Sequence, residues 1–138
     1  MQTGDGRVPG PAGEAQQYRA RLIVWSVMAL SIMMYFVVIR VVTPANPTEN
    51  PTLVTALLIV AFALVVASFV AKRRLLSRTD NVDVAVRRRQ ADIVALVLCE
   101  AAALYGLPVW FITGWSRSYV FLVLGLAGIL LHYPKRES

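Results

Sequence analysis

Cysteine and histidine are nearly missing from this chain of 138 residues, which holds one of each, Cys99 and His132. A single cysteine excludes a disulfide within the chain, and these two residues cannot form the Cys/His cluster that holds zinc. No pairing of a nucleophile with a base is visible either. We therefore expect no metal site, no cofactor and no enzymatic activity.

Acidic residues are also few. Eight Asp and Glu stand against fourteen Lys and Arg, which gives a formal net charge of +6. A basic balance can indicate nucleic-acid binding, but here the basic residues lie between apolar runs and no base-reading motif is present. We therefore expect no nucleic-acid partner. A hydrophobic share of 57% and a mean hydropathy of +0.60 are instead typical of integral membrane proteins.

Four apolar runs predict an all-α membrane protein with four transmembrane helices in an antiparallel bundle. The expected spans are about residues 22–41, 51–72, 91–114 and 117–133. The last run is short for a segment that needs about 20 residues to cross a bilayer, but a tight turn precedes it and two basic residues follow it. Pro108 lies within the third span and removes a helix hydrogen bond, so we expect a kink beyond Glu100.

The segments outside the spans indicate how the chain lies in the membrane. Residues 1–20 are expected to form a disordered to partly helical tail, residues 21–134 the membrane domain, and residues 135–138 a second short tail. Twelve of the fourteen Lys and Arg residues lie in the two ends of the chain and in the link between the second and third spans. Because cytoplasmic segments are rich in Lys and Arg, we expect a multi-pass protein of the inner (plasma) membrane with both termini in the cytoplasm.

Six basic residues beside the link between the second and third spans form an expected lipid-facing or partner-facing group: Lys72, Arg73, Arg74, Arg87, Arg88 and Arg89. They have two interpretations. They either only set the topology or also bind anionic lipid, to which each contributes about 1 kcal/mol near the surface. The lipid bilayer is the expected partner, and binding of anionic lipid and assembly into a homo-oligomer are open alternatives.

Glu100 is the only charged residue from Ile93 to Ser116. A charged side chain at the centre of a membrane costs about 2.5–3.5 kcal/mol on insertion scales, so we expect it to be paired, protonated or used. Burial disfavours the charged form of a carboxyl group, and we therefore expect Glu100 to be mostly protonated at rest. Two interpretations remain open, namely proton or ion binding and a permanent hydrogen-bond donor between helices.

The depth of each residue in the membrane suggests what surrounds Glu100. A rise of about 1.5 Å per residue places Ser31 of the first span at the level of Glu100, and we expect a hydrogen bond between them. Small residues let membrane helices approach closely. The expected helix-packing residues are Ala63, Ala67, Gly106, Gly125 and Gly128.

The stretch CEAAALYGL at residues 99–107 resembles the carboxylate helix of the proteolipid c subunit of rotary ATP synthases. In that family a membrane carboxylate is followed by four residues and then Tyr-Gly-Leu, which matches Glu100, Tyr105, Gly106 and Leu107. The second and third spans with their basic link would correspond to the hairpin of that family. The resemblance implies that Glu100 is an ion-binding carboxylate, and we place Ser31 and Tyr105 in the same proton-binding group.

The predicted function is therefore that of a small integral membrane protein with a buried, proton-binding glutamate that could translocate ions. Two alternatives stay open. One is a non-catalytic accessory or scaffold protein whose basic link docks lipid or a partner. The other is a small proton-coupled transporter.

Overall fold

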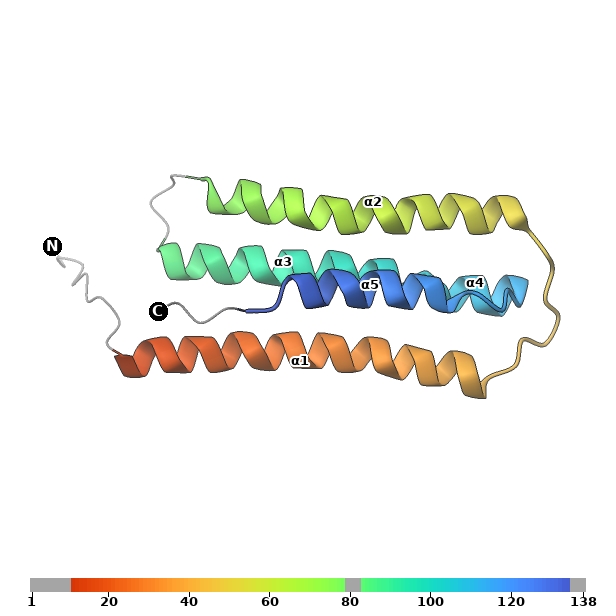
Figure 1. Cartoon of the computed structure of the whole chain (residues 1–138), viewed down its shortest axis with the longest axis horizontal. Helices are drawn as coiled ribbons and strands as arrows, with labels where there is room; N and C mark the ends of the chain where they lie inside the picture. The colour runs from red at the N-terminus through yellow and green to blue at the C-terminus, as the bar shows by residue number, and fades with distance from the viewer. Residues whose placement is uncertain (1–10, 79–82, 135–138) are drawn as a thin grey trace, which may run out of the picture.

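The computed structural model describes residues 11–78 and 83–134, and within these ranges all regular secondary structure is helical. Five helices follow one another within these ranges. They are α1 (Pro11–Val41), α2 (Pro51–Leu76), α3 (Val84–Leu104), α4 (Gly106–Thr113) and α5 (Tyr119–Leu131). The long helices lie side by side, with α4 continuing the line of α3, and the loop 42–50 joins α1 to α2 at one end of the bundle (Figure 1).

Three segments are long and apolar enough to cross a membrane, as judged by length and composition: Ala15–Val41, Pro51–Leu76 and Val84–Thr113. They correspond to the first three predicted spans. The predicted fourth span is a shorter apolar helix, α5, with 13 residues. At 1.5 Å per residue it is about 20 Å long, less than the roughly 30 Å of a bilayer's hydrocarbon core.

Local capping explains where two of the helices begin. The side chain of Asn50 accepts a hydrogen bond from the backbone N–H of Leu53 at 3.0 Å, and Pro51 occupies the first helical position of α2. Asp83 caps α3 in the same way through the N–H of Ala85. This cap lets α3 begin well before residue 91, the expected start of the third span. In the predicted N-terminal tail, residues 11–20 are helical, and residues 1–10 and 135–138 lie outside the described residues.

The break between α3 and α4 falls where the sequence predicts a kink. Helix α3 ends at Leu104, and α4 begins two residues later, at Gly106. Pro108 has no N–H to donate to the carbonyl of Leu104, so the helical hydrogen-bond pattern cannot continue unbroken through this point. A Cβ atom at Gly106 would lie only 3.1 Å from the carbonyl oxygen of Ser118. The break therefore brings the chain close to the start of α5.

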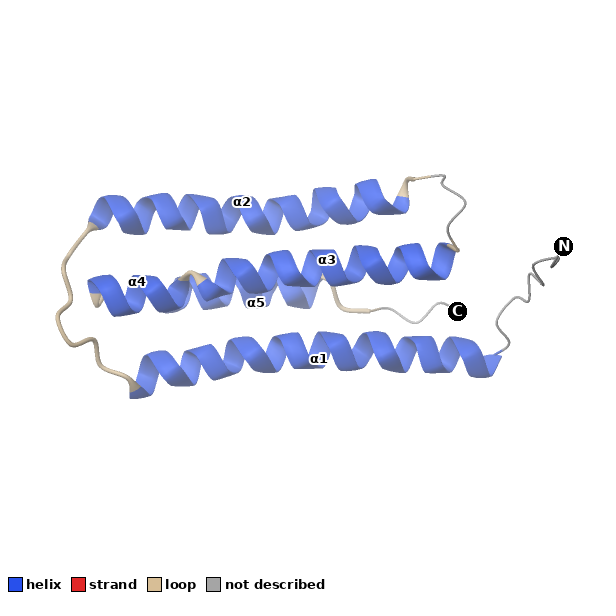
Figure 2. Cartoon of the chain, turned by 180° about the vertical axis from the view of Figure 1, so that it is seen from behind, coloured by secondary structure: helices blue, strands red, loops and turns tan. Residues whose placement is uncertain are grey.

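Helix α3 lies between α1 and α2 and also packs along α5 (Figure 2). Small residues allow this crowding. A Cβ atom at Gly125 would lie 2.6 Å from the carbonyl oxygen of Cys99, and one at Gly128 would lie 2.6 Å from its Sγ. The three glycines expected at helix contacts thus occupy close contacts in the structure.

The alanines expected at helix contacts lie elsewhere. Ala63 is exposed and Ala67 is half-buried, whereas the buried residues of α2 are Ala61, Val65 and Ser68. Positions 61, 65 and 68 recur at the spacing of one helix face, and position 63 is rotated about 200° from position 61. Ala63 and Ala67 therefore lie away from the face of α2 that packs within the bundle, and their role in contacts between helices stays a prediction.

Candidate functional site

Glu100 of α3 forms a compact polar cluster with two hydroxyl groups of α1. The Oγ of Ser31 lies 2.6 Å from Oε1 of Glu100, and the hydroxyl of Tyr35 lies 3.0 Å from the same oxygen. The two hydroxyl oxygens are themselves 2.9 Å apart. Ser31 and Tyr35 are four residues apart, so one face of α1 presents both groups. The predicted hydrogen bond between Ser31 and Glu100 is present, together with a second one that was not predicted.

The hydroxyls of this cluster can serve either form of the carboxyl group. A hydroxyl donates one hydrogen bond and can accept others. Ser31 and Tyr35 can both donate to the charged carboxylate, and either can accept from the protonated acid. Glu100 is half-buried at the line where α1 meets α3, so the cluster lies at the edge of the bundle and not at its centre.

Tyr105, which the sequence places in the same group, lies apart from this cluster. It packs against the apolar residues around Ala61 and Phe121, between α2 and α5. Five residues of helix rotate a side chain by about 500°, which leaves Tyr105 and Glu100 about 140° apart around α3. Tyr35 of α1 is instead the tyrosine that contacts Glu100. The placement of Tyr105 in the proton-binding group is therefore not supported by the geometry.

A second polar cluster joins α1, α2 and α3 near one end of the bundle. Asp92 is only 8% exposed, and its carboxylate forms ion pairs with Arg21 of α1 and Lys72 of α2. The Nζ of Lys72 lies 2.8 Å from Oδ1 of Asp92. The sequence places Lys72 in the lipid-facing or partner-facing group, but in the structure its ammonium group forms an ion pair with Asp92 within the bundle. Asp92 was not predicted as a site residue. Only its buried position between two cations distinguishes it, and the sequence does not show that position.

A third polar group lies beside this ion-pair cluster. His132, just after α5, is only 5% exposed, and its Nε2 lies 3.0 Å from the Oγ of Ser68. The hydroxyl of Ser68 donates to the carbonyl oxygen of Val65 at 2.6 Å. Which of the two groups donates in the contact between Ser68 and His132 depends on the tautomer of the imidazole. Cys99 also contacts Ser68, at 3.4 Å.

Burial favours the neutral form of the His132 imidazole. Burial lowers the pKa of His132, and the nearby charge of Lys72 lowers it further, while Asp92 acts in the opposite direction. The contact between His132 and Ser68 attaches the C-terminal end of α5 to α2. Nothing in the sequence indicates that Ser68 lies opposite His132.

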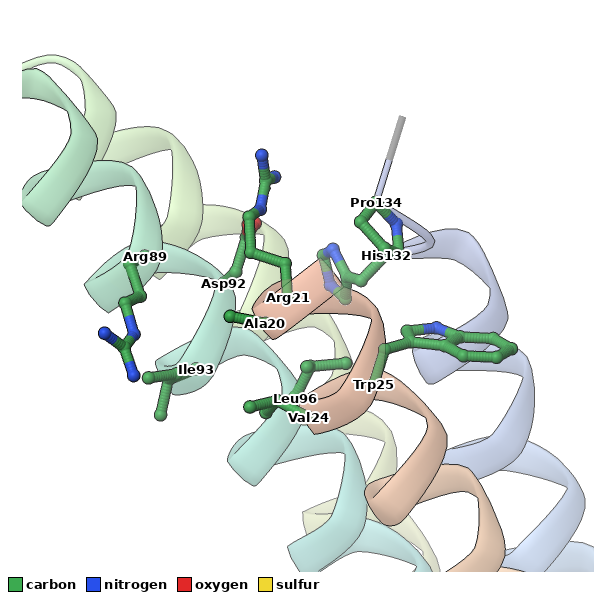
Figure 3. A pocket seen from close by; sticks show the side chains of 10 residues that line it. All are labelled: Ala20, Arg21, Val24, Trp25, Arg89, Asp92, Ile93, Leu96, His132 and Pro134. Carbon is green, nitrogen blue, oxygen red and sulfur yellow. The ribbon is translucent and has the colours of Figure 1, made fainter. Parts of the chain in front are cut away.

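Two hollows lie along α1 and α3 at the end that carries the ion-pair cluster. The smaller, of about 20 Å³, is lined by Arg21, Val24, Asp92, Leu96 and His132, among others (Figure 3). The larger, of about 370 Å³, is lined by Gln16, Gln17, Arg21, Asp83 and Arg89, among others. Arg21 and Arg89 line both hollows, so these are adjacent. A volume of 10–15 Å³ suffices for one water molecule.

The other predicted basic residues lie at the same end of the helices. Arg73 and Arg74 of α2 and Arg89 of α3 are exposed, whereas Arg87 and Arg88 are half-buried. Across residues 11–78 and 83–134, no group of three or more His, Cys, Asp or Glu side chains could hold a metal ion.

Comparison with family models, curated proteins and solved structures gave no match to this chain. The resemblance of residues 99–107 to the ATP synthase c subunit therefore stays a prediction.

Proposed function

We propose that this chain is a multi-pass membrane protein in which α1, α2, the line of α3 and α4, and the shorter helix α5 form an antiparallel bundle of four spans. Support comes from the three long apolar segments and from the many exposed hydrophobic side chains on them, such as Ile23, Leu30 and Ile59. Such surfaces are covered by lipid in a membrane protein. The concentration of Lys and Arg at one end supports a cytoplasmic location for that end and for both termini.

Within this bundle, Glu100 binds and releases a proton. The observation that carries this proposal is the convergence of two hydroxyls on one oxygen of the carboxyl group, at 2.6 and 3.0 Å. Two hydroxyl donors directed at one oxygen stabilise the charged carboxylate. A carboxylate alone in hydrocarbon lacks such donors. The same hydroxyls can accept a hydrogen bond from the protonated form. Glu100 can therefore form hydrogen bonds with Ser31 and Tyr35 in both protonation states.

The alternative role, that of a permanently protonated donor, requires only one acceptor opposite Glu100. The pair Ser31 and Tyr35 exceeds that requirement. The local resemblance to the c subunit of rotary ATP synthases points in the same direction, because it gives Glu100 the place of an ion-binding carboxylate. The proposal covers proton binding and leaves transport across the membrane as a further step.

Carbodiimide labelling tests this function, because a lipid-soluble carbodiimide adds to protonated carboxyl groups within membranes. The protein in native membranes is treated over a range of pH and its mass is measured. We expect one label on the wild-type protein, none on Glu100→Gln, and less labelling as the pH rises and the carboxyl group ionises. Glu49→Gln is the matched control, since Glu49 lies in the exposed loop 42–50.

Two results would contradict proton binding at Glu100. One is the absence of any label that depends on Glu100. The other is labelling that stays constant over the whole pH range, which would show a glutamate that keeps its proton permanently.

A further inference from the structure

The contacts between α1 and α3 form a continuous seam that leads from the basic end of the bundle to Glu100. On α1 the seam contains Arg21, Val24, Met28 and Ser31, which recur at the spacing of one helix face. On α3 it contains Asp92, Leu96 and Glu100, each four residues from the next. Ion pairing of Arg21 with Asp92 closes one end of this stretch, and the hydrogen bond of Ser31 to Glu100 closes the other.

Space for water is present at the basic end of the seam. The hollow of about 370 Å³ opens beside Gln17 and Arg89, and the cavity of about 20 Å³ adjoins it. Arg21, Asp92 and His132 are among the residues that line the smaller cavity. Among the described residues, the buried Nε of Arg21 has no hydrogen-bond partner. The volume of this cavity exceeds the about 10–15 Å³ that one water molecule occupies.

An apolar barrier separates this cavity from Glu100. Val24 and Leu96 belong to the cavity lining, and in Figure 3 they lie further along the helices than Arg21 and Asp92. Leu96 is 3% exposed and belongs to the same apolar cluster as Ile32 and Met28. Glu100 lies four residues beyond Leu96, which is about 6 Å along the helix. The barrier is therefore about one helical turn thick.

On the other side of Glu100 the seam is filled with larger side chains. Phe36, Ile39, Leu107 and Trp110 all belong to the apolar cluster there. The indole N–H of Trp110 donates to the carbonyl oxygen of Val42 at 2.8 Å, which ties α4 to the end of α1. Counted along the helices, Asp92 lies about 12 Å from Glu100, whereas Thr113, which lines a hollow at the opposite end, lies about 20 Å away.

We propose that Glu100 exchanges its proton with the basic end of the bundle, through water that passes Leu96 and Val24 along the seam between α1 and α3. This inference rests on the proposed function of Glu100, because it describes how the proton reaches that group. Leu96 acts as a positioning residue that sets the width of the barrier. Proton exchange is then one-sided, with the cytoplasmic side as its source.

Hydrogen–deuterium exchange at the carboxyl group tests the route. The protein in lipid bilayers is moved into deuterated buffer, and the carboxylic-acid band in the infrared spectrum is followed with time. The band of Glu100 is identified by its loss in Glu100→Gln. We expect Leu96→Trp to fill the seam and slow the exchange about tenfold, a barrier change of about 1.4 kcal/mol. Leu96→Ala widens the seam and should speed the exchange by a similar factor.

Val97→Trp is the matched control, because Val97 is the next residue of α3 and is 46% exposed on the outer surface. We expect this variant to exchange at the wild-type rate. If Leu96→Trp does not fold, the exchange rate of Leu96→Ala tests the route instead, since this variant removes bulk from the seam. The amide bands of the same spectra report whether each variant keeps its helices.

The outcomes separate the route from the proposed function. A Glu100 band that titrates with pH but exchanges at the same rate in both Leu96 variants would overturn the route and leave proton binding intact. An equal effect of Val97→Trp and Leu96→Trp would also overturn the route, because it would indicate access through the lipid. The absence of any Glu100 band would overturn both.

Discussion

Ser31 and Glu100 are 69 positions apart in the sequence, yet the hydroxyl of the first lies 2.6 Å from the carboxyl group of the second. This contact joins the first long helix to the central one within their apolar segments. A hydrogen bond placed there both attaches α1 to α3 and provides the carboxyl group with a donor. The same two atoms thus connect the stability of the bundle with the chemistry proposed for Glu100.

A double-mutant cycle measures this connection. We expect Ser31→Ala and Glu100→Leu to show a coupling energy of about 0.6 kcal/mol and at most about 1.7 kcal/mol, the range found for side-chain hydrogen bonds in a membrane protein. The free energy of unfolding in detergent micelles is the measurement. Ser77→Ala paired with Glu100→Leu is the control, since Ser77 donates to the carbonyl of Arg74 at the exposed end of α2. Strictly additive effects for the pair of Ser31 and Glu100 would show that the contact contributes nothing.

The sequence predicts the Glu100 cluster in part, because membrane depth can be counted along a helix. Equal distances from the cytoplasmic ends of two spans bring Ser31 and Glu100 to one level. Depth says nothing about which way a side chain points or which helices are neighbours. Tyr35 was therefore missed, and Tyr105 was included although it faces another side of α3.

The other features of the fold also fall into two groups, those that follow from the local sequence and those that depend on which helices are neighbours. Pro108 and the cap at Asn50 act on their own backbone, so the break after α3 and the start of α2 follow from the local sequence. The ion pairs of Asp92 and the contact between His132 and Ser68 depend on helices that are distant in the sequence. The outward position of Ala63 likewise depends on which face of α2 meets α3. No local sequence pattern predicts these contacts or the face of α2 that points outward.

Replacement of Asp92 by asparagine should destabilise the bundle, because it leaves two positive charges, Arg21 and Lys72, side by side without a counter-charge. Removal of one partner from a buried ion pair costs about 3–5 kcal/mol. The side chains of Arg21 and Lys72 are 21% and 25% exposed, so water reduces the cost, and we expect roughly 2 kcal/mol. Thermal unfolding in detergent measures the change.

Asp83→Asn is the matched control for Asp92→Asn. It makes the same chemical change on the same helix, but Asp83 is an exposed N-cap and asparagine caps equally well. We expect its unfolding free energy to stay within about 0.5 kcal/mol of the wild type, as is usual for surface substitutions. Equal losses in the two variants would show that the burial of Asp92 between two cations has no special effect.

Gly128→Ala should be destabilising because a Cβ atom there would lie 2.6 Å from the Sγ of Cys99. Overpacking of this kind costs about 1–3 kcal/mol. The added variant Cys99→Ala removes the sulfur atom and should restore part of that loss. Ala63→Val adds more bulk on the outer side of α2 and should have little effect. A Gly128→Ala protein as stable as the wild type would contradict the close contact between α3 and α5.

Stability should decrease as the pH falls below the range in which histidine is normally neutral, because His132 is buried in its neutral form. Burial lowers its pKa in the folded state, while the unfolded chain takes up a proton near pH 6.5. The unfolded state therefore binds more protons below that pH, and the free energy of unfolding falls with the pH until the folded state is protonated as well. His132→Gln removes this titration, and Ser77→Ala, which keeps it, is the control. Unfolding is followed between pH 7.5 and pH 5. We expect the wild type and Ser77→Ala to lose stability more steeply than His132→Gln, and equal slopes in all three would show that His132 keeps the same pKa in the folded and unfolded states.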